Sequence, residues 1–200
     1  MKISETAWQI FNQSIEDYHK SDNVDTAMHN PHEPNTLEAM LYHKNWIDTV
    51  QWHLEDIIRD PNIAPEEALQ IKRRIDNSNQ KRTDLVEDID EWFYHKFSSS
   101  TPSSEASLNT ETPAWAVDRF SILALKIYHM DIEARRNEIS EELKEKNQDK
   151  LHILRTQKQD LSIALDQLLN DLETGNKKMK LYKQMKMYND KELNPVLYNK

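Results

Sequence analysis

Apolar residues recur at helical spacing along most of the chain, and the clearest case is the stretch 35–60. Asn35 can cap a helix there, and Glu38 stands where a capping box needs it. Pro61 disfavours helix at Asp60. Wound at about 100° per residue, the stretch therefore predicts a helix over 35–60 with one apolar face: Ala39, Met40, Ile47, Val50, Leu54, Ile57 and Ile58.

The rest of this helix divides into two polar faces of different character. One carries Lys44, Asp48, Gln51 and Glu55, and this composition predicts an ordinary solvent face. The other interleaves short polar groups with aromatic rings, which suits a buried polar network or a binding site. Its members are Glu38, Tyr42, Asn45, Thr49, Trp52, His53, Asp56 and Arg59.

Four more helices follow from the same periodicity. One spans 4–20 with Ser4 as cap, and one runs from Pro65 to about residue 97. A third begins at Pro113, with Thr112 as cap, and is apolar on most sides, which predicts burial. The last carries leucines in a heptad pattern and ends at Gly175, with the preceding turn placed at 145–149.

Composition and connections predict an all-α antiparallel bundle of about five long helices. The 200 residues fit a single domain, 1–200, and contain one glycine. The segment 98–113 is rich in Ser and Thr and predicts a flexible crossover. A short basic C-terminal segment, 176–191, carries six lysines against one aspartate and leads to a terminus predicted to be extended.

Charge and residue usage exclude several classes of function. A net charge of −9 argues against general nucleic-acid binding. The absence of cysteine excludes disulfides, thiolate metal sites and cysteine nucleophiles. No apolar stretch is long enough for a transmembrane segment, and the N-terminus has no signal-like apolar run, so we expect a cytoplasmic protein.

Polar stripes on the second and third helices predict a shared inter-helix region. Their short connection should make them antiparallel neighbours, with the apolar fourth helix packed against both. Within this region, Arg82 interrupts an apolar stripe, so we expect it to point inward and pair with a polar group of the second or fourth helix. The candidate ligand-binding residues are Asn45, Trp52, His53, Asp56, Gln80, Arg82, Thr83, Glu87 and His129.

Paired carboxylates in the same region raise the question of a metal cofactor. Oxygen-rich sites suit Mg²⁺ or Mn²⁺, and the candidate ligands are His53, Asp56, Asp84 and Glu87. All-helical nucleotide pyrophosphohydrolases use carboxylate pairs in a related way, but here the first pair is His and Asp. The alternative is a structural network in which Arg59 and Arg82 neutralise these carboxylates.

Four segments together resemble a bacterial family of all-helical cytoplasmic proteins classed as a domain of unknown function. They are EPNTLEAMLYHKNWIDTVQWHLEDIIRDP, IKRRIDNSNQKRTDLVEDID, DRFSILALKIYHM and KMYNDKELNPVLY. The resemblance implies that the polar stripes are a family feature and links the family loosely to gene neighbourhoods for envelope polysaccharide synthesis. It supplies no reaction.

Two functions of different kinds remain open from the sequence. The polar region could bind or process a phosphorylated small molecule such as a nucleotide sugar. Alternatively, the chain could be a non-enzymatic adaptor or scaffold for a glycosyltransferase, or could form a homodimer through the leucine seam of the fifth helix.

Overall fold

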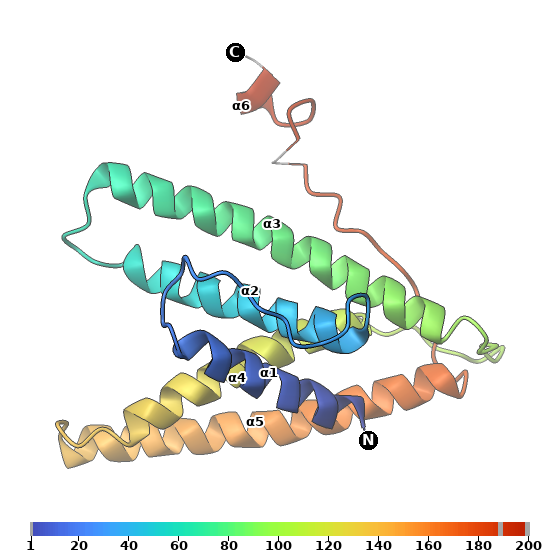
Figure 1. Cartoon of the computed structure of the whole chain (residues 1–200). Coiled ribbons are helices and arrows are strands. Elements are labelled where there is room, and N and C mark those ends of the chain that lie inside the picture. The colour runs from blue at the N-terminus through green and yellow to red at the C-terminus, as the bar shows by residue number, and fades with distance from the viewer. Residues whose placement is uncertain (1, 188–189, 199–200) are drawn as a thin grey trace.

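The computed structural model describes residues 2–187 and 190–198. These residues confirm the all-α prediction and form five long helices and one short one (Figure 1). The helices are α1 (Ile3–His19), α2 (Leu37–Ile57), α3 (Pro65–Lys96), α4 (Pro113–Ala134), α5 (Glu141–Glu173) and α6 (Pro195–Tyr198). None of them, within the described residues, is long and apolar enough to cross a membrane.

Two antiparallel hairpins, α2–α3 and α4–α5, make up most of the molecule, as Figure 1 shows. Helix α1 differs from the expected antiparallel order, because residues 20–36 lead the chain back before α2 begins (Figure 1). Ser14 accordingly bonds to the carbonyl of Tyr42, while His19 lies beside His53. Helices α1 and α2 therefore run in the same direction.

The capping residues at the N-termini of α1 and α2 differ from the sequence prediction. The Thr36 side chain caps α2 by accepting from the backbone N–H of Ala39 at 3.2 Å, whereas Asn35 adopts a left-handed conformation with φ of 65°. Ser4 does not cap α1. Its hydroxyl instead donates to Asp166 of α5 at 2.7 Å, so this polar group is used to join two helices.

The C-terminal half differs from prediction at two further places. The turn between α4 and α5 lies at 135–140 and not at 145–149, because Ser140 caps α5 by accepting from the N–H of Leu143. Near the C-terminus, the stretch predicted to be extended contains the short helix α6. The predicted starts at Pro65 and at Pro113 are confirmed, and Thr112 caps α4 as expected.

The Ser-rich crossover between α3 and α4 is attached to the chain that leaves α5. Ser103 donates to the carbonyl of Gly175, and Ser107 exchanges backbone hydrogen bonds with residues 176 and 178. Gly175 has φ of 75°, and a Cβ atom there would lie 2.6 Å from the carbonyl oxygen of Thr101. A glycine is therefore needed both for the left-handed turn and for the close approach of the crossover.

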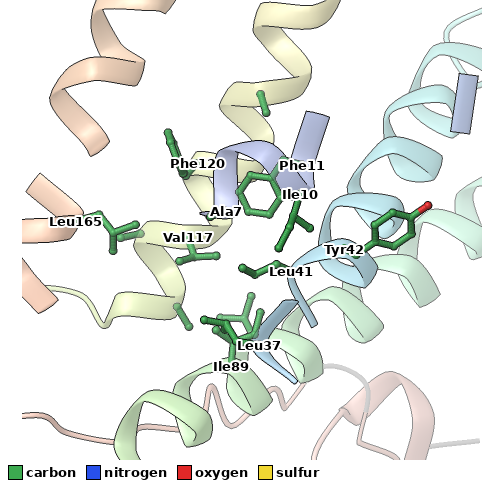
Figure 2. Close-up of a cluster of buried hydrophobic side chains, with 14 of the residues drawn as sticks. Ala7, Ile10, Phe11, Leu37, Leu41, Tyr42, Ile89, Val117, Phe120 and Leu165 are labelled. Carbon is green, nitrogen blue, oxygen red and sulfur yellow. The ribbon is translucent and has the colours of Figure 1, made fainter. Parts of the chain in front are cut away.

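One large hydrophobic core joins the five long helices. Figure 2 shows side chains of α1, α2, α3, α4 and α5 meeting at this core, with Phe11, Leu41 and Val117 near its centre. The leucine seam of α5 is part of it, since Leu165 and Leu172 are buried within the chain. The core surrounds α2 with apolar neighbours, and the buried polar side chains of α2 pair with one another and with polar groups of α3 and α4.

Candidate functional site

Four charged side chains from three helices form a buried ionic cluster: Lys44 and Asp48 of α2, Arg82 of α3 and Asp118 of α4. The Lys44 side chain is 0% exposed, and those of Asp48 and Asp118 are 3% and 4% exposed. Arg82 reaches the cluster from the side and keeps 25% of its side chain exposed. With two positive and two negative charges the cluster is neutral as a whole, which is what burial of charge requires.

Close ion pairs hold the cluster together. The Nζ atom of Lys44 contacts Asp48 and lies 2.9 Å from Asp118. The Arg82 guanidinium donates two hydrogen bonds to Asp118, from Nε at 2.8 Å and from its terminal nitrogen at 2.5 Å. Such a two-point contact fixes both position and orientation. The prediction that Arg82 points inward and pairs with a polar group of the second or fourth helix is confirmed.

Neutral polar groups extend the cluster along α2 and α4. The Ser121 hydroxyl donates to Asp48 at 2.6 Å and accepts from the Asn45 amide at 3.0 Å. The side-chain oxygen of Asn45 is buried and has no hydrogen-bond partner among the described residues. The network is thus complete around the charges and has one open acceptor at its neutral end.

The two carboxyl groups of the cluster have pKa values shifted in opposite directions. Burial raises the pKa of Asp48, although Lys44 and Ser121 act against it. Burial also acts to raise the pKa of Asp118, but Lys44 and Arg82 outweigh it and hold that pKa below the ordinary value. Asp48 is therefore the carboxyl group of the cluster that accepts a proton more readily.

The solvent-face assignment of Lys44 and Asp48 is wrong. The two residues are four apart on one helix and can pair, but they face α4 and not water. Helix α2 packs against α1, α3 and α4, which leaves little of its surface for solvent. The position of Asp118 on the apolar helix α4 supplies the partner that makes this burial tolerable.

Two hollows open beside the ionic cluster and share Arg82 as a lining residue. The first, which we call the Trp52 hollow, lies mainly along α2 and has a volume of about 310 Å³. It combines one aromatic face with more acidic than basic groups. Its lining residues are Asp48, Gln51, Trp52, Glu55, Asp56, Arg59, Arg82, Ile122 and Leu125.

The second, which we call the Lys186 hollow, is formed by α3, α4 and the basic C-terminal segment, and has a volume of about 560 Å³. Lys186 donates to the hydroxyl of Thr83 at 2.5 Å and to the carbonyl of Asn79 at 3.2 Å. Here basic groups outnumber acidic ones. The lining residues are Lys72, Asp76, Asn79, Arg82, Thr83, Trp115, Gln184 and Lys186.

Aromatic and imidazole rings form a further group near the C-terminal end of α2. The Trp52 ring stacks on His129 with centroids 4.8 Å apart and an interplanar angle of 6°. His53 stacks on Tyr18 at 5.0 Å. Burial lowers the pKa of His129 to about 4, and it also lowers that of His53. Both imidazoles are therefore neutral at pH 7.

The candidate ligand-binding residues lie in four places and not in one shared region. Asn45 and Arg82 belong to the ionic cluster, and Trp52, His53 and His129 belong to the ring group. Asp56 lines the Trp52 hollow. The remaining candidates lie along α3, where Thr83 and Glu87 contact the C-terminal segment and Gln80 donates to Asp84.

The candidate magnesium or manganese ligands are likewise not assembled into one group. Asp84 and Glu87 are engaged on α3 by Gln80 and by the backbone of Gln184. His53 instead lies next to two other histidines, one of which, His19, ends α1. Within the described residues, that histidine group is the set of His and acidic side chains close enough to share an ion.

Sequence reasoning missed several residues that define these sites: Lys44, Asp48, Asp118, Ser121, His19, Trp115 and Lys186. A usable signal existed for the first pair, because a lysine and an aspartate four residues apart face the same direction. The others come together only through the tertiary fold, so no local pattern marks them.

Fold and site together define an all-α protein with a charged cluster at the centre of its bundle. Its residues 38–181 match the family described as "Protein of unknown function (DUF4254)", and the chain belongs to this family. No curated protein and no solved structure is significantly similar to the chain.

Proposed function

We propose that the protein binds a phosphorylated small molecule, such as a sugar phosphate or a nucleotide sugar, in the Lys186 hollow. The observation that carries the proposal is the gathering of three cationic side chains, Lys72, Arg82 and Lys186, around one cavity in a protein of net charge −9. Basic groups that converge on a cavity are what phosphate recognition requires.

Charge neutralisation within the hollow is incomplete, which supports an anionic ligand. Lys72 pairs with Asp76, and Arg82 is committed to Asp118. The Nζ atom of Lys186, however, donates to a hydroxyl and to a carbonyl, both of them neutral. Its positive charge is therefore available to an incoming phosphate.

A ring-binding surface lies in the same hollow. Trp115 of α4 is half-buried at its wall, and an indole face packs well against a sugar or a base. A volume of about 560 Å³ is in the range of small-molecule sites. A phosphate held by the cations and a ring placed on Trp115 together describe the ligand class.

The proposed function gives a role to the basic C-terminal segment. Residues 183–186 lie along α3, where the backbone of Gln184 donates to Glu87 and Lys183 pairs with Glu91. This path places Lys186 at the hollow. The adaptor alternative has less support, because α5 buries its leucine seam within its own chain.

Calorimetric titration with UDP-glucose, glucose 1-phosphate and their unphosphorylated parents tests the proposal. Lys186→Gln should weaken binding of the phosphorylated probes by roughly 10-fold or more, because a hydrogen bond to a charged group contributes about 1.5–3 kcal/mol. Lys183→Gln is the matched control, since it removes the same charge from the same segment outside the hollow.

Two results would contradict the proposal. One is equal affinity for the phosphorylated probes in the Lys186→Gln variant and the wild type. The other is that uridine or glucose binds as tightly as the phosphorylated compounds.

A further inference from the structure

Three histidines from three different helices converge at one point near the end of α2. His19 is the last residue of α1, His53 lies on α2 and His129 lies on α4. One ring nitrogen of each lies within 4.8 Å of the others. The hollows described above do not include this point between the imidazoles, so its chemistry is independent of the phosphate site.

The spacing of the imidazole nitrogens suits a tetrahedral metal ion. The Nε2 atoms of His19 and His53 are 3.3 Å apart. Two nitrogen ligands of one tetrahedral zinc ion are separated by about 3.3–3.4 Å, since each Zn–N bond is about 2.0–2.1 Å long. A zinc ion could therefore join this pair without a change in their separation.

Hydrogen bonding fixes which nitrogen of His19 is free to bind. Its Nδ1 atom lies 2.7 Å from the carbonyl oxygen of Ile15. A carbonyl only accepts, so Nδ1 carries the hydrogen and the neutral ring presents the lone pair of Nε2 to His53. Histidines that bind metals in proteins are commonly oriented in this way by a backbone carbonyl.

An unpaired nitrogen supplies the second, independent observation. The Nε2 atom of His129 is buried and has no hydrogen-bond partner among the described residues. A buried nitrogen without a partner carries a desolvation cost, which coordination to a cation would remove.

Aromatic neighbours hold all three rings in place. Tyr18 stacks on His53, Trp52 stacks on His129, and Tyr128 lies against His19 with centroids 4.5 Å apart. Ligands whose rotamers are fixed by packing lose little entropy when an ion binds.

A fourth ligand position lies on the open side of the group. Oδ1 of Asp22 is 3.8 Å from Nε2 of His53, and the Asp22 side chain is 63% exposed. The backbone of Asp22 is left-handed, with φ of 47°, which turns the chain directly after α1. A carboxylate or a water molecule can complete the coordination from here.

We infer that His19, His53 and His129 bind one Zn²⁺ ion, with Asp22 or water as the fourth ligand. Imidazole suits zinc and its neighbours among the transition metals, whereas Mg²⁺ and Mn²⁺ prefer oxygen ligands. This assignment differs in metal from the magnesium or manganese site expected from the sequence and shares only His53 with its ligands. Three histidines plus an open position is also the ligand set of hydrolytic and hydrating zinc centres.

Metal binding is measured on tag-free protein by equilibrium dialysis against micromolar zinc and by the visible absorption of bound Co²⁺. We expect one ion per chain and the intense absorption of tetrahedral cobalt. His53→Phe and His129→Phe keep the ring packing but remove a ligand nitrogen. They should weaken binding by more than the roughly 10–100-fold that loss of an outer-shell partner costs. His152→Phe, at an exposed position on α5, is the control and should bind as the wild type does.

Circular dichroism of each variant separates loss of the site from loss of the fold. If a phenylalanine variant fails to fold, His19→Gln gives the same comparison from α1. The inference is overturned if folded wild type binds no stoichiometric zinc, if saturation needs millimolar zinc, or if the folded variants bind like the wild type.

Discussion

Lys44→Met tests the energetics of the buried ionic cluster most directly. Methionine keeps the unbranched stem of the lysine and removes only its charge. In the wild type two cations face two carboxylates, and in the variant Arg82 alone faces both Asp48 and Asp118. Removing one partner of a buried pair costs about 3–5 kcal/mol, since the remaining charge stays buried without compensation.

The cost should depend on pH because burial already raises the pKa of Asp48. Without Lys44 this pKa rises further, so the folded variant holds a proton that the unfolded chain has released. This difference in bound protons is absent at a pH below the pKa of the unfolded chain, and it destabilises the folded variant more as the pH rises. The free energy lost on substitution should therefore be smaller at pH 5 than at pH 8.

Urea unfolding followed by far-ultraviolet circular dichroism measures these differences. Lys81→Met is the control, because Lys81 is an exposed lysine on α3 and its loss should change stability by no more than about 0.5 kcal/mol. The reasoning is refuted if Lys44→Met costs no more than this control. An equal cost at the two pH values would contradict the role given to Asp48.

Three further substitutions have defined outcomes. Gly175→Ala should lower the free energy of unfolding by more than about 1 kcal/mol in a urea titration, because it combines a positive φ with a contact to Thr101; an unchanged midpoint would exclude the close approach. Burial raises the pKa of Asp90 from 3.8 to about 6, so ionisation of Asp90 lowers the free energy of unfolding as the pH rises through this range. The stability of Asp90→Asn relative to wild type should therefore improve from pH 4 to pH 7 by at most about 3 kcal/mol, and a flat difference would be inconsistent with the shift. Leu165→Ala should cost about 2–5 kcal/mol with no change in sedimentation, because Leu165 is 1% exposed within a single chain; dissociation of an oligomer would instead support pairing through α5.

Much of the fold could be predicted because helix starts and stops are local signals. Pro65, Thr112 with Pro113, and Gly175 act through backbone geometry, and each marks a helix terminus as expected. The α4–α5 turn was misplaced because no glycine or proline marks it. Ser140 caps α5 there, but the neighbouring polar residues are compatible with either a helix or a turn, so the sequence does not single out the position of this cap.

The site was only partly predictable because helical winding describes one helix at a time. Arg82 was recognised as inward because it interrupts an apolar stripe. Lys44 and Asp48 have the composition of a solvent face, and only contact with α4 shows that this face is covered. His19 and His53 come from helices that run in parallel, a direction set by the long connection before α2.

The attachment of the crossover at Gly175 fixes where the basic C-terminal segment begins, so the length of the segment determines how far along α3 it reaches. Backbone hydrogen bonds of residues 175–178 to residues 103 and 107 fix its starting point, and the hydrogen bond from Lys186 to Thr83 fixes a second point within it. Between these two points the chain forms no helix or strand, and Met185 is left-handed with φ of 48°, so each residue added or removed shifts the lysine by at most about 3.3–3.6 Å along α3. The length of this segment, more than the identity of its intervening residues, should therefore determine whether a cation reaches the hollow, and a single-residue deletion there should act like Lys186→Gln.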